Sequence, residues 1–159
     1  MIWAKNYGIP FRSNIKFHDN QIFLASQDNI LYSINPSNGE KNWQLSTSLT
    51  FLKSEFKNNI ALDELNNNII FLNTSGELYS INYVTQRINW VLNFKNLSQQ
   101  NEANLFLSQP VVIKDETVIV STDKSLLSYN VISGARNWNK IVAPILKPVI
   151  TQNNIFTFT

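Results

Sequence analysis

Short apolar segments alternate with short polar segments along the whole chain. Runs of three to seven residues rich in Ile, Val, Leu, Phe and Tyr are separated by residues such as Asn, Asp, Ser and Gly. This spacing is typical of short β-strands joined by tight turns, and no segment keeps the period of a helix. Residues 68–72 and 117–120 are apolar without clean alternation, which indicates strands covered on both faces. The pattern therefore predicts an all-β protein.

The strand pattern occurs in three copies. Residues 30–43, 77–90 and 125–138 align without a gap, and each block ends on Asn-Trp. Successive tryptophans are 40, 47 and 48 residues apart, and each unit holds about four predicted strands. Four antiparallel strands at this period are typical of a β-propeller blade, a small sheet that covers its apolar faces by stacking on its neighbours. The shared positions are Leu31, Leu78 and Leu126; Ser33, Ser80 and Ser128; Asn35, Asn82 and Asn130; Asn42, Asn89 and Asn137; and Trp43, Trp90 and Trp138.

The repeat predicts a β-propeller of four-stranded antiparallel blades, with about three complete blades and partial blades at both ends. A propeller ring closes with about four to eight blades. We therefore expect either a piece of a larger ring or a small four-bladed ring, and an isolated chain that associates or is unstable, because open strand edges pair with other chains. The expected divisions are 1–8 (end of a preceding blade), 9–45, 54–92 and 107–140 (blades) and 145–159 (start of a further blade), with first strands at 11–17, 56–62 and 110–113.

The tryptophans are predicted to be packing anchors between blades. A large ring wedged between sheets is buried economically when its indole N–H bonds a backbone carbonyl. This structural role is assigned to Trp3, Trp43, Trp90 and Trp138.

Glycines are predicted at turns that need a positive φ. Gly39 and Gly134 lie between the third and fourth strands of their blades, and Gly76 lies in the preceding turn of the middle unit. Gln86 replaces the glycine in the middle copy. Because glycine adopts positive φ without steric cost, the turn at Gln86 must be built differently or carry strain.

The candidate groups for chemistry map onto turns of the repeat. Carboxylates could serve acid–base work or bind calcium, but their equivalent positions favour solvated turns, and His18 is expected at the surface beside one of them. The asparagines shared by the repeats are likewise expected in turns. The acidic residues concerned are Asp19, Asp63, Glu64, Asp115 and Glu116 in one turn and Asp28 and Asp123 in the next.

Composition removes several classes of function. The 13 basic and 11 acidic residues are scattered and leave a net charge of +2, which is no nucleic-acid footprint. The absence of cysteine from the sequence excludes disulfides, Cys-ligated zinc, iron–sulfur clusters and thiol catalysis. Asparagine is abundant, with 24 residues, so matches to the glycosylation acceptor pattern at Asn73 and Asn96 are expected by chance. No run approaches a membrane span, and the N-terminus lacks the layout of a signal peptide.

Two linkers between predicted blades are the remaining candidates for binding. They cover residues 46–53 and 93–103. Loops on a rigid scaffold often carry binding residues, although each linker also fits an accommodated insertion.

The turn and tryptophan of each unit resemble those of quinoprotein-type (PQQ-like) propeller repeats. In that family a turn similar to Thr-Gly-Lys is followed by a tryptophan that docks on the next blade, as in residues 35–43 and 130–138. The family includes enzymes that hold pyrroloquinoline quinone with calcium and non-enzymatic relatives. The sequence has no cysteine pair, and no carboxylate lies outside the turns as an obvious ligand.

Within this family the chain is most similar to BamB-type outer-membrane assembly lipoproteins. The resemblance implies a non-enzymatic scaffold for protein–protein interaction at the periplasmic side of the outer membrane, with the barrel-assembly machinery as a partner. It implies no catalytic, cofactor-binding or metal-binding residues, no nucleic-acid partner and no membrane span in this segment. The alternatives are a fragment of a PQQ-dependent dehydrogenase and a sensor-type propeller domain.

Overall fold

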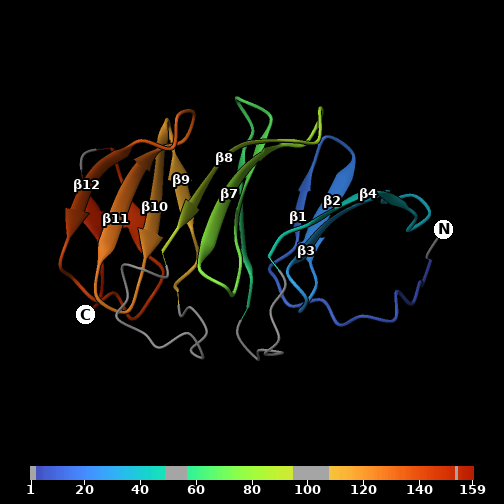
Figure 1. Cartoon of the computed structure of the whole chain (residues 1–159), viewed down its shortest axis with the longest axis horizontal. Helices are drawn as coiled ribbons and strands as arrows, with labels where there is room; N and C mark the ends of the chain where they lie inside the picture. Colours follow the sequence, from blue (N-terminus) through green and yellow to red (C-terminus); the bar gives the residue numbers. More distant parts are fainter. Residues whose placement is uncertain (1–2, 49–56, 95–107, 153) are drawn as a thin grey trace.

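Three four-stranded antiparallel sheets follow one another along the chain (Figure 1). The computed structural model describes residues 3–48, 57–94, 108–152 and 154–159, and no helix occurs among them. A two-stranded sheet follows the third large sheet. Each large sheet is a simple meander in which consecutive strands pair, because tight turns join antiparallel neighbours. These are the predicted blades of an all-β propeller.

The strand bounds of the first sheet are β1 (Lys16–His18), β2 (Gln21–Ala25), β3 (Ile30–Ile34) and β4 (Lys41–Ser46). The second sheet holds β5 (Asn59–Asp63), β6 (Asn68–Leu72), β7 (Glu77–Asn82) and β8 (Arg87–Asn93). The third holds β9 (Val112–Lys114), β10 (Thr117–Ser121), β11 (Leu126–Asn130) and β12 (Arg136–Lys140). The two-stranded sheet consists of β13 (Val149–Ile150) and β14 (Ile155–Phe156).

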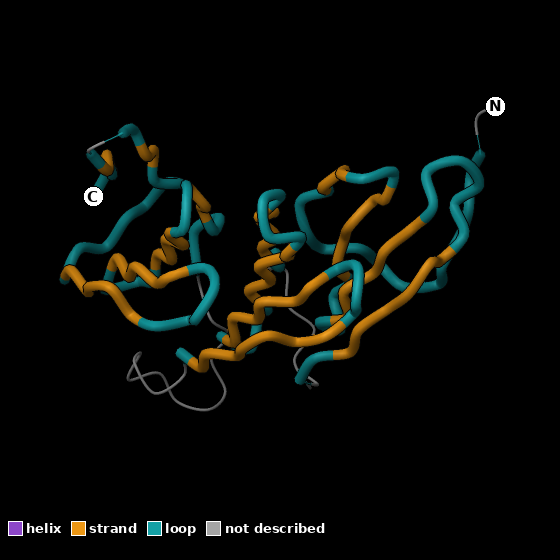
Figure 2. Tube along the Cα trace, turned by 90° about the horizontal axis from the view of Figure 1, so that it is seen from above, coloured by secondary structure: helices purple, strands orange, loops and turns teal. Residues whose placement is uncertain are grey.

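The sheets stack face to face along an open arc. The first strands of consecutive sheets contact one another, β1 with β5, β5 with β9 and β9 with β13. These strands therefore form the inner edge, and β4, β8 and β12 form the outer edge. Figure 2 shows the arc from above, with the two termini at its opposite ends.

An apolar core fills each space between neighbouring sheets. Between the first and second sheets, Phe23 and Leu31 pack with Tyr79 and Ile81. Between the second and third, a separate core includes Ile70, Leu72, Leu127 and Tyr129. The middle sheet is thus buried on both faces, which is the physical reason that β6 is apolar at consecutive positions.

Residues 3–9 form no strand and cover the face of the first sheet that points away from the second sheet. Trp3, Tyr7 and Phe11 pack on Leu24 and Tyr32. The rings of Phe11 and Tyr32 meet edge to face with their centres 5.5 Å apart. Side-chain packing, not backbone pairing, holds residues 3–9 to the sheet.

The first strand of each sheet is shifted from its predicted position. The prediction of a strand at 11–17 is wrong over most of its length, because the chain crosses between sheets there. Phe11 bridges Ser26 of the first sheet, whereas Ser13 bridges Asn58 beside the second. The remaining first strands begin two to three residues later than predicted, at Asn59 and Val112.

Each fourth strand contains a β-bulge at the repeated asparagine. Ser33 pairs with Trp43 and Ile34 pairs with Lys41, so Asn42 has no partner in the ladder. Its amide Nδ2 donates a hydrogen bond to the buried Ser33 Oγ at 3.1 Å. The same bond joins Asn89 to Ser80 and Asn137 to Ser128, each at 3.2 Å.

A buried polar network joins the first two sheets at one end. Asn58 Nδ2 donates to the carbonyl of Ser26 at 2.8 Å, and Asn58 Oδ1 accepts from the Thr74 amide at 3.1 Å. Thr74 Oγ1 donates to Asn29 Oδ1 at 2.9 Å, and Asn29 Nδ2 donates to Ser75 Oγ at 3.2 Å. These side chains are buried, so the bonds offset the cost of removing their polar groups from water.

Candidate functional site

Two tryptophans dock on equivalent turns, one between β3 and β4 and the other between β11 and β12. We call each of these docking positions a socket. The indole N–H of Trp90 donates to the carbonyl of Val131 at 3.0 Å, and that of Trp3 donates to the carbonyl of Pro36 at 2.6 Å. Val131 and Pro36 are equivalent in the repeat. Each ring also lies against the glycine of the turn, Gly134 or Gly39.

The glycines are needed at these sockets for two physical reasons. Gly134 has a φ of 71° and Gly39 a φ of 69°, which is the left-handed region. A Cβ on Gly134 would lie 2.9 Å from Trp90 Cδ2, closer than carbon atoms pack, and a Cβ on Gly39 would overlap the ring of Trp3. The turns therefore exclude a side chain both by conformation and by contact.

The turn between β7 and β8, which is the middle copy, has the same backbone conformation as the other two copies but forms no tryptophan socket. Gln86 has a φ of 60°, and its amide bonds the Asn82 carbonyl at 2.8 Å, as Gly134 bonds Asn130 at 2.9 Å. The sequence left two alternatives for this turn, a different backbone or a strained one. The backbone is unchanged, so Gln86 carries the strain of a positive φ. Trp43 packs against Phe23, and among the described residues its indole N–H has no hydrogen-bond acceptor.

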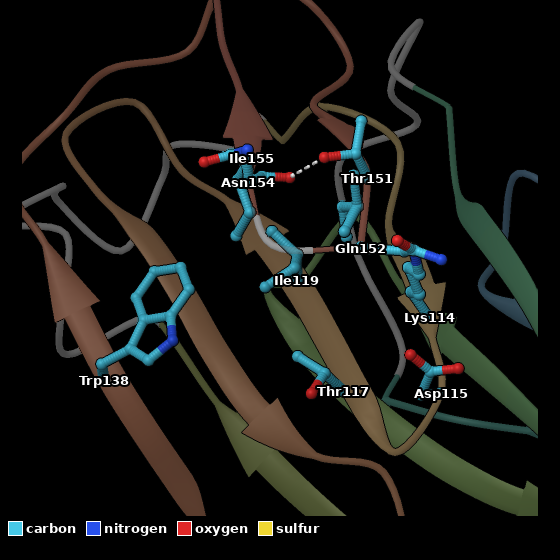
Figure 3. A pocket seen from close by; sticks show the side chains of 10 residues that line it. Lys114, Asp115, Thr117, Ile119, Trp138, Thr151, Gln152, Asn154 and Ile155 are labelled. Carbon is cyan, nitrogen blue, oxygen red and sulfur yellow. Dashed lines mark hydrogen bonds between the residues drawn. The ribbon is translucent and has the colours of Figure 1, made fainter.

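Trp138 faces a cavity, whereas Trp3 and Trp90 each face a turn. Figure 3 shows Trp138 on β12 and Ile119 on β10, with Ile155 of β14 and Asn154, the residue before that strand, beyond them. This cavity has a volume of about 240 Å³. A second cavity of about 550 Å³ adjoins Trp138, Leu126 and Ile155. Space on this scale accommodates several side chains or a small ligand.

The two-stranded sheet leaves an apolar surface at the C-terminal end of the arc. Ile155 lines both cavities, whereas Phe156 on the opposite face is exposed. In the described part of the chain, no third strand pairs with β14. The exposed apolar side chains of this end are Ile141, Ile145, Leu146, Val149, Phe156 and Phe158. Exposed apolar side chains in this number at one end of a molecule are typical of an interaction site.

The titratable groups are dispersed over the described part of the chain. Within that part no three His, Asp or Glu side chains come together as metal ligands. His18 lies half-buried at the end of β1, with its Nδ1 3.8 Å from Glu64 Oε1. Asp19 and Asp115 occupy left-handed turn positions, as expected of turn residues. Asp63 differs: it is buried at the end of β5 and accepts hydrogen bonds from Asn66 Nδ2, so the expectation of a solvated carboxylate is wrong there.

Burial raises the pKa of several tyrosines above the ordinary value of 10.0. For Tyr129, desolvation raises the pKa and the nearby Arg136 partly offsets the rise. The pKa of Tyr79 is raised by burial and by its hydrogen bond to Glu77 at 2.8 Å. Both hydroxyls therefore favour the neutral form in the folded chain.

The repeated asparagines divide into two structural groups. Asn82 and Asn130 lie in the predicted turns, where Asn82 Oδ1 accepts from the Thr85 amide and Asn130 Oδ1 accepts from the Ser133 amide. Asn35 Oδ1 likewise accepts within its turn, from the Ser37 amide. The prediction that Asn42, Asn89 and Asn137 are turn residues is wrong, because they form the strand bulges.

The remaining sequence candidates have these positions. Asn73 of the first acceptor pattern is buried, and its amide bonds Thr47 and Glu77. Asn96 and most of the linkers 46–53 and 93–103 lie outside the described residues. Gly76 has a φ of 78° and accepts a backbone bond from Phe94 at 2.8 Å. The buried asparagines Asn29 and Asn58 carry no signal in the sequence that would identify them.

Comparison with known proteins identifies a family from the sequence and related folds from the structure. The family model described as "Outer membrane protein assembly factor BamB" matches residues 1–159. A search of curated protein sequences gives no significant match. No helix in the described part of the chain has the length and apolar character needed to span a membrane.

Several solved structures share the fold. BamB from Moraxella catarrhalis is similar with a TM-score of 0.72 at 13% identity, over 98% of this chain and 49% of that protein, so this chain spans about half its length. Quinohemoprotein alcohol dehydrogenase from Comamonas testosteroni is similar with a TM-score of 0.67 at 13% identity, over 86% of this chain and 22% of the enzyme. The WD40 repeats of RRP9 are similar with a TM-score of 0.66 at 8% identity, over 87% of this chain and 40% of theirs. Identities this low describe the propeller fold alone, whereas the match over the whole sequence places the chain in the family of the outer membrane protein assembly factor BamB.

Proposed function

We propose that the chain is a non-enzymatic propeller scaffold that binds protein partners during assembly of outer-membrane β-barrel proteins. The observation that carries the proposal is the match of residues 1–159 to the family model described as "Outer membrane protein assembly factor BamB". The exposed apolar side chains around β13 and β14 are the described surface that such a scaffold offers to a protein partner.

The proposal includes a location and a division of the chain. We infer a place at the periplasmic side of the outer membrane, with the barrel-assembly machinery as a partner, and we retain blades at 9–45, 54–92 and 107–140. Trp3, Trp43, Trp90 and Trp138 then act as structural anchors, as do the turn glycines Gly39, Gly76 and Gly134.

Deletion of the gene in its native host tests this function. We expect lower amounts of folded outer-membrane β-barrel proteins, restored by the full-length gene and not by one that carries Val149→Asp and Phe156→Asp. Leu65→Asp is the control, because Leu65 is also an exposed apolar residue, in a turn of the second sheet away from β13 and β14. Unchanged barrel levels after deletion, or fractionation of the protein to the cytoplasm, would contradict the proposal.

A fragment of a quinone-dependent dehydrogenase is the competing function, since an enzyme of that class shares the fold. Titration of the full-length protein with pyrroloquinoline quinone and calcium separates the two. We expect no saturable binding, and tight stoichiometric binding would favour the enzyme.

A further inference from the structure

We propose that Trp43, Ile88 and Val91 form a docking site for an extended apolar segment of a partner protein that carries a carboxylate beside its apolar side chains. The inference rests on the proposed scaffold function and specifies the place and the chemistry of the contact. The docking site lies at the outer edge of the molecule between the first and second sheets, each of which has all four strands.

Trp43 differs from the tryptophan of the next interface because it is not docked. Between the second and third sheets, Trp90 donates its indole N–H to the Val131 carbonyl. The turn that faces Trp43 holds Gln86 in place of the glycine. Trp43 is half-buried, and its indole N–H has no acceptor in the described part of the chain. This N–H is therefore available to an acceptor from another molecule.

The outer strand of the second sheet presents two apolar side chains toward Trp43. Ile88 pairs with Ile81 and Val91 pairs with Tyr79. Directly opposite residues share a face of the sheet, and Ile81 and Tyr79 belong to the core on which Trp43 packs. Ile88 is 44% exposed and Val91 is 46% exposed. They extend the core between the two sheets to the surface as an apolar patch.

This apolar pair is specific to the middle copy of the repeat. At the same positions, two residues before and one residue after the tryptophan, the outer strands of the first and third sheets have polar side chains. These are Lys41, Gln44, Arg136 and Asn139. Charged side chains on an edge strand discourage pairing with other chains. The second sheet lacks that protection at the same interface where the tryptophan lacks a socket.

An extended backbone fits the docking site because β8 also has an unpaired edge. β8 is the outermost strand of its sheet, and no described strand pairs with its outer side. An added strand bonds such an edge through its backbone, and its alternate side chains point to one face. Apolar side chains on that face would cover Ile88 and Val91, and a carbonyl of the same segment would supply the acceptor that Trp43 lacks.

Charge favours an acidic segment over a second copy of this chain. Arg87 begins β8, is exposed, and makes no ion pair with another described residue. The three outer strands, all within the described ranges, contain cations and no carboxylate. The cations are Lys41, Arg87, Arg136 and Lys140. The outer edge of a second copy would bring like charges together, whereas a carboxylate on the bound segment complements Arg87.

A synthetic peptide and the indole signals of the protein test the docking site. The probe is as long as β8, seven residues, with valine and threonine in alternation and a glutamate at each end. In NMR spectra of the isotope-labelled whole chain, the peptide should shift the indole N–H signal of Trp43 and slow its exchange with water. The signal of Trp90, whose N–H is already bonded, should not change.

Three variants identify the residues that bind the peptide. Ile88→Arg combined with Val91→Asn gives β8 the side chains of the third sheet and should weaken binding by about tenfold or more. Ile132→Asn is the matched control, because Ile132 is an apolar residue of similar exposure, 53%, in a turn of the third sheet. Gln86→Gly should weaken binding although it does not destabilise the chain, because Trp43 then docks in its own socket.

Several results would overturn the inference. They are undiminished binding to the Ile88→Arg, Val91→Asn variant, an indole N–H of Trp43 already protected from exchange in the peptide-free chain, and a dimer of the chain that excludes the peptide. A peptide with lysine in place of both glutamates should bind more weakly at low salt, and equal binding would refute the carboxylate. Absent peptide binding together with a host deletion phenotype refutes the docking site alone, and peptide binding without that phenotype refutes the proposed function alone.

Discussion

The ring of Trp90 lies where a side chain on Gly134 would have to lie. A Cβ on this glycine would be 2.9 Å from Trp90 Cδ2, and the glycine has a φ of 71°. The two residues belong to different sheets, so the glycine of one blade determines how closely the tryptophan of the preceding blade can dock. The sequence alone shows only that Trp90 and Gly134 belong to successive copies of the repeat, not that they are in contact.

Gly134→Ala should destabilise the chain by more than the left-handed backbone alone costs. That conformation costs an L-residue about 1–2 kcal/mol, and displacement of the Trp90 ring adds to it. Gly8→Ala is the matched control, because Gly8 also has a φ of 71° but no atom lies within 4 Å of its Cβ position. Urea denaturation of both variants measures the difference, and equal losses would show that the Trp90 contact contributes nothing.

Gln86→Gly should stabilise the chain. Relief of the left-handed strain gains about 1–2 kcal/mol, and the added freedom of glycine in the unfolded state costs about 0.5–1 kcal/mol, so the net gain lies between about 0 and 1.5 kcal/mol. The change also opens a socket for Trp43. Thermal unfolding beside Gln86→Ala, which keeps the Cβ, measures the gain; an unfolding temperature no higher than that of Gln86→Ala would refute the account.

Asn89→Ala should cost about 1–3 kcal/mol, because it removes donors from two groups at once. Asn89 Nδ2 bonds Ser80 Oγ at 3.2 Å and Asn68 Oδ1 at 2.9 Å, and both residues are buried. A double-mutant cycle with Ser80→Ala isolates the bond at the bulge. Additive free energies of unfolding in this cycle would mean that the Asn89–Ser80 bond does not stabilise the sheet.

The free energy of unfolding should fall above about pH 10, where the tyrosines of the unfolded chain ionise. Burial raises the pKa of Tyr129 in the folded chain, so the unfolded state loses its proton first. The stabilisation is complete below the unfolded pKa and is lost as the pH rises through the folded pKa. Tyr129→Phe should show a shallower decline in urea titrations between pH 9 and pH 11 (a window set by the tyrosine pKa of about 10), and an unchanged slope would contradict this assignment.

Much of the fold could be predicted because strands and turns depend on local patterns. The second strands of the sheets, the left-handed glycines Gly39 and Gly134 and the Asn-based turns lie where the sequence places them. Short-range sterics and side chain–backbone bonds decide these features within a few residues. The first strands were misplaced because residues 11–14 bond to two sheets, and neither contact is local.

The candidate site shows the same limit. The repeat identified Trp138 as an anchor, but its cavity depends on β13 and β14, which follow it by more than ten residues. The bulge role of Asn42, Asn89 and Asn137 was likewise hidden, since a bulge is defined by pairing between strands.

The sequence by itself determined the repeat, the strand content and the residues that permit tight turns, because those properties follow from spacing and from backbone sterics. Only the tertiary structure decided which tryptophans have a socket and which asparagines are buried. Those outcomes depend on how one sheet lies against the next, and the contacts that fix this join residues more than thirty positions apart, such as Trp90 and Val131.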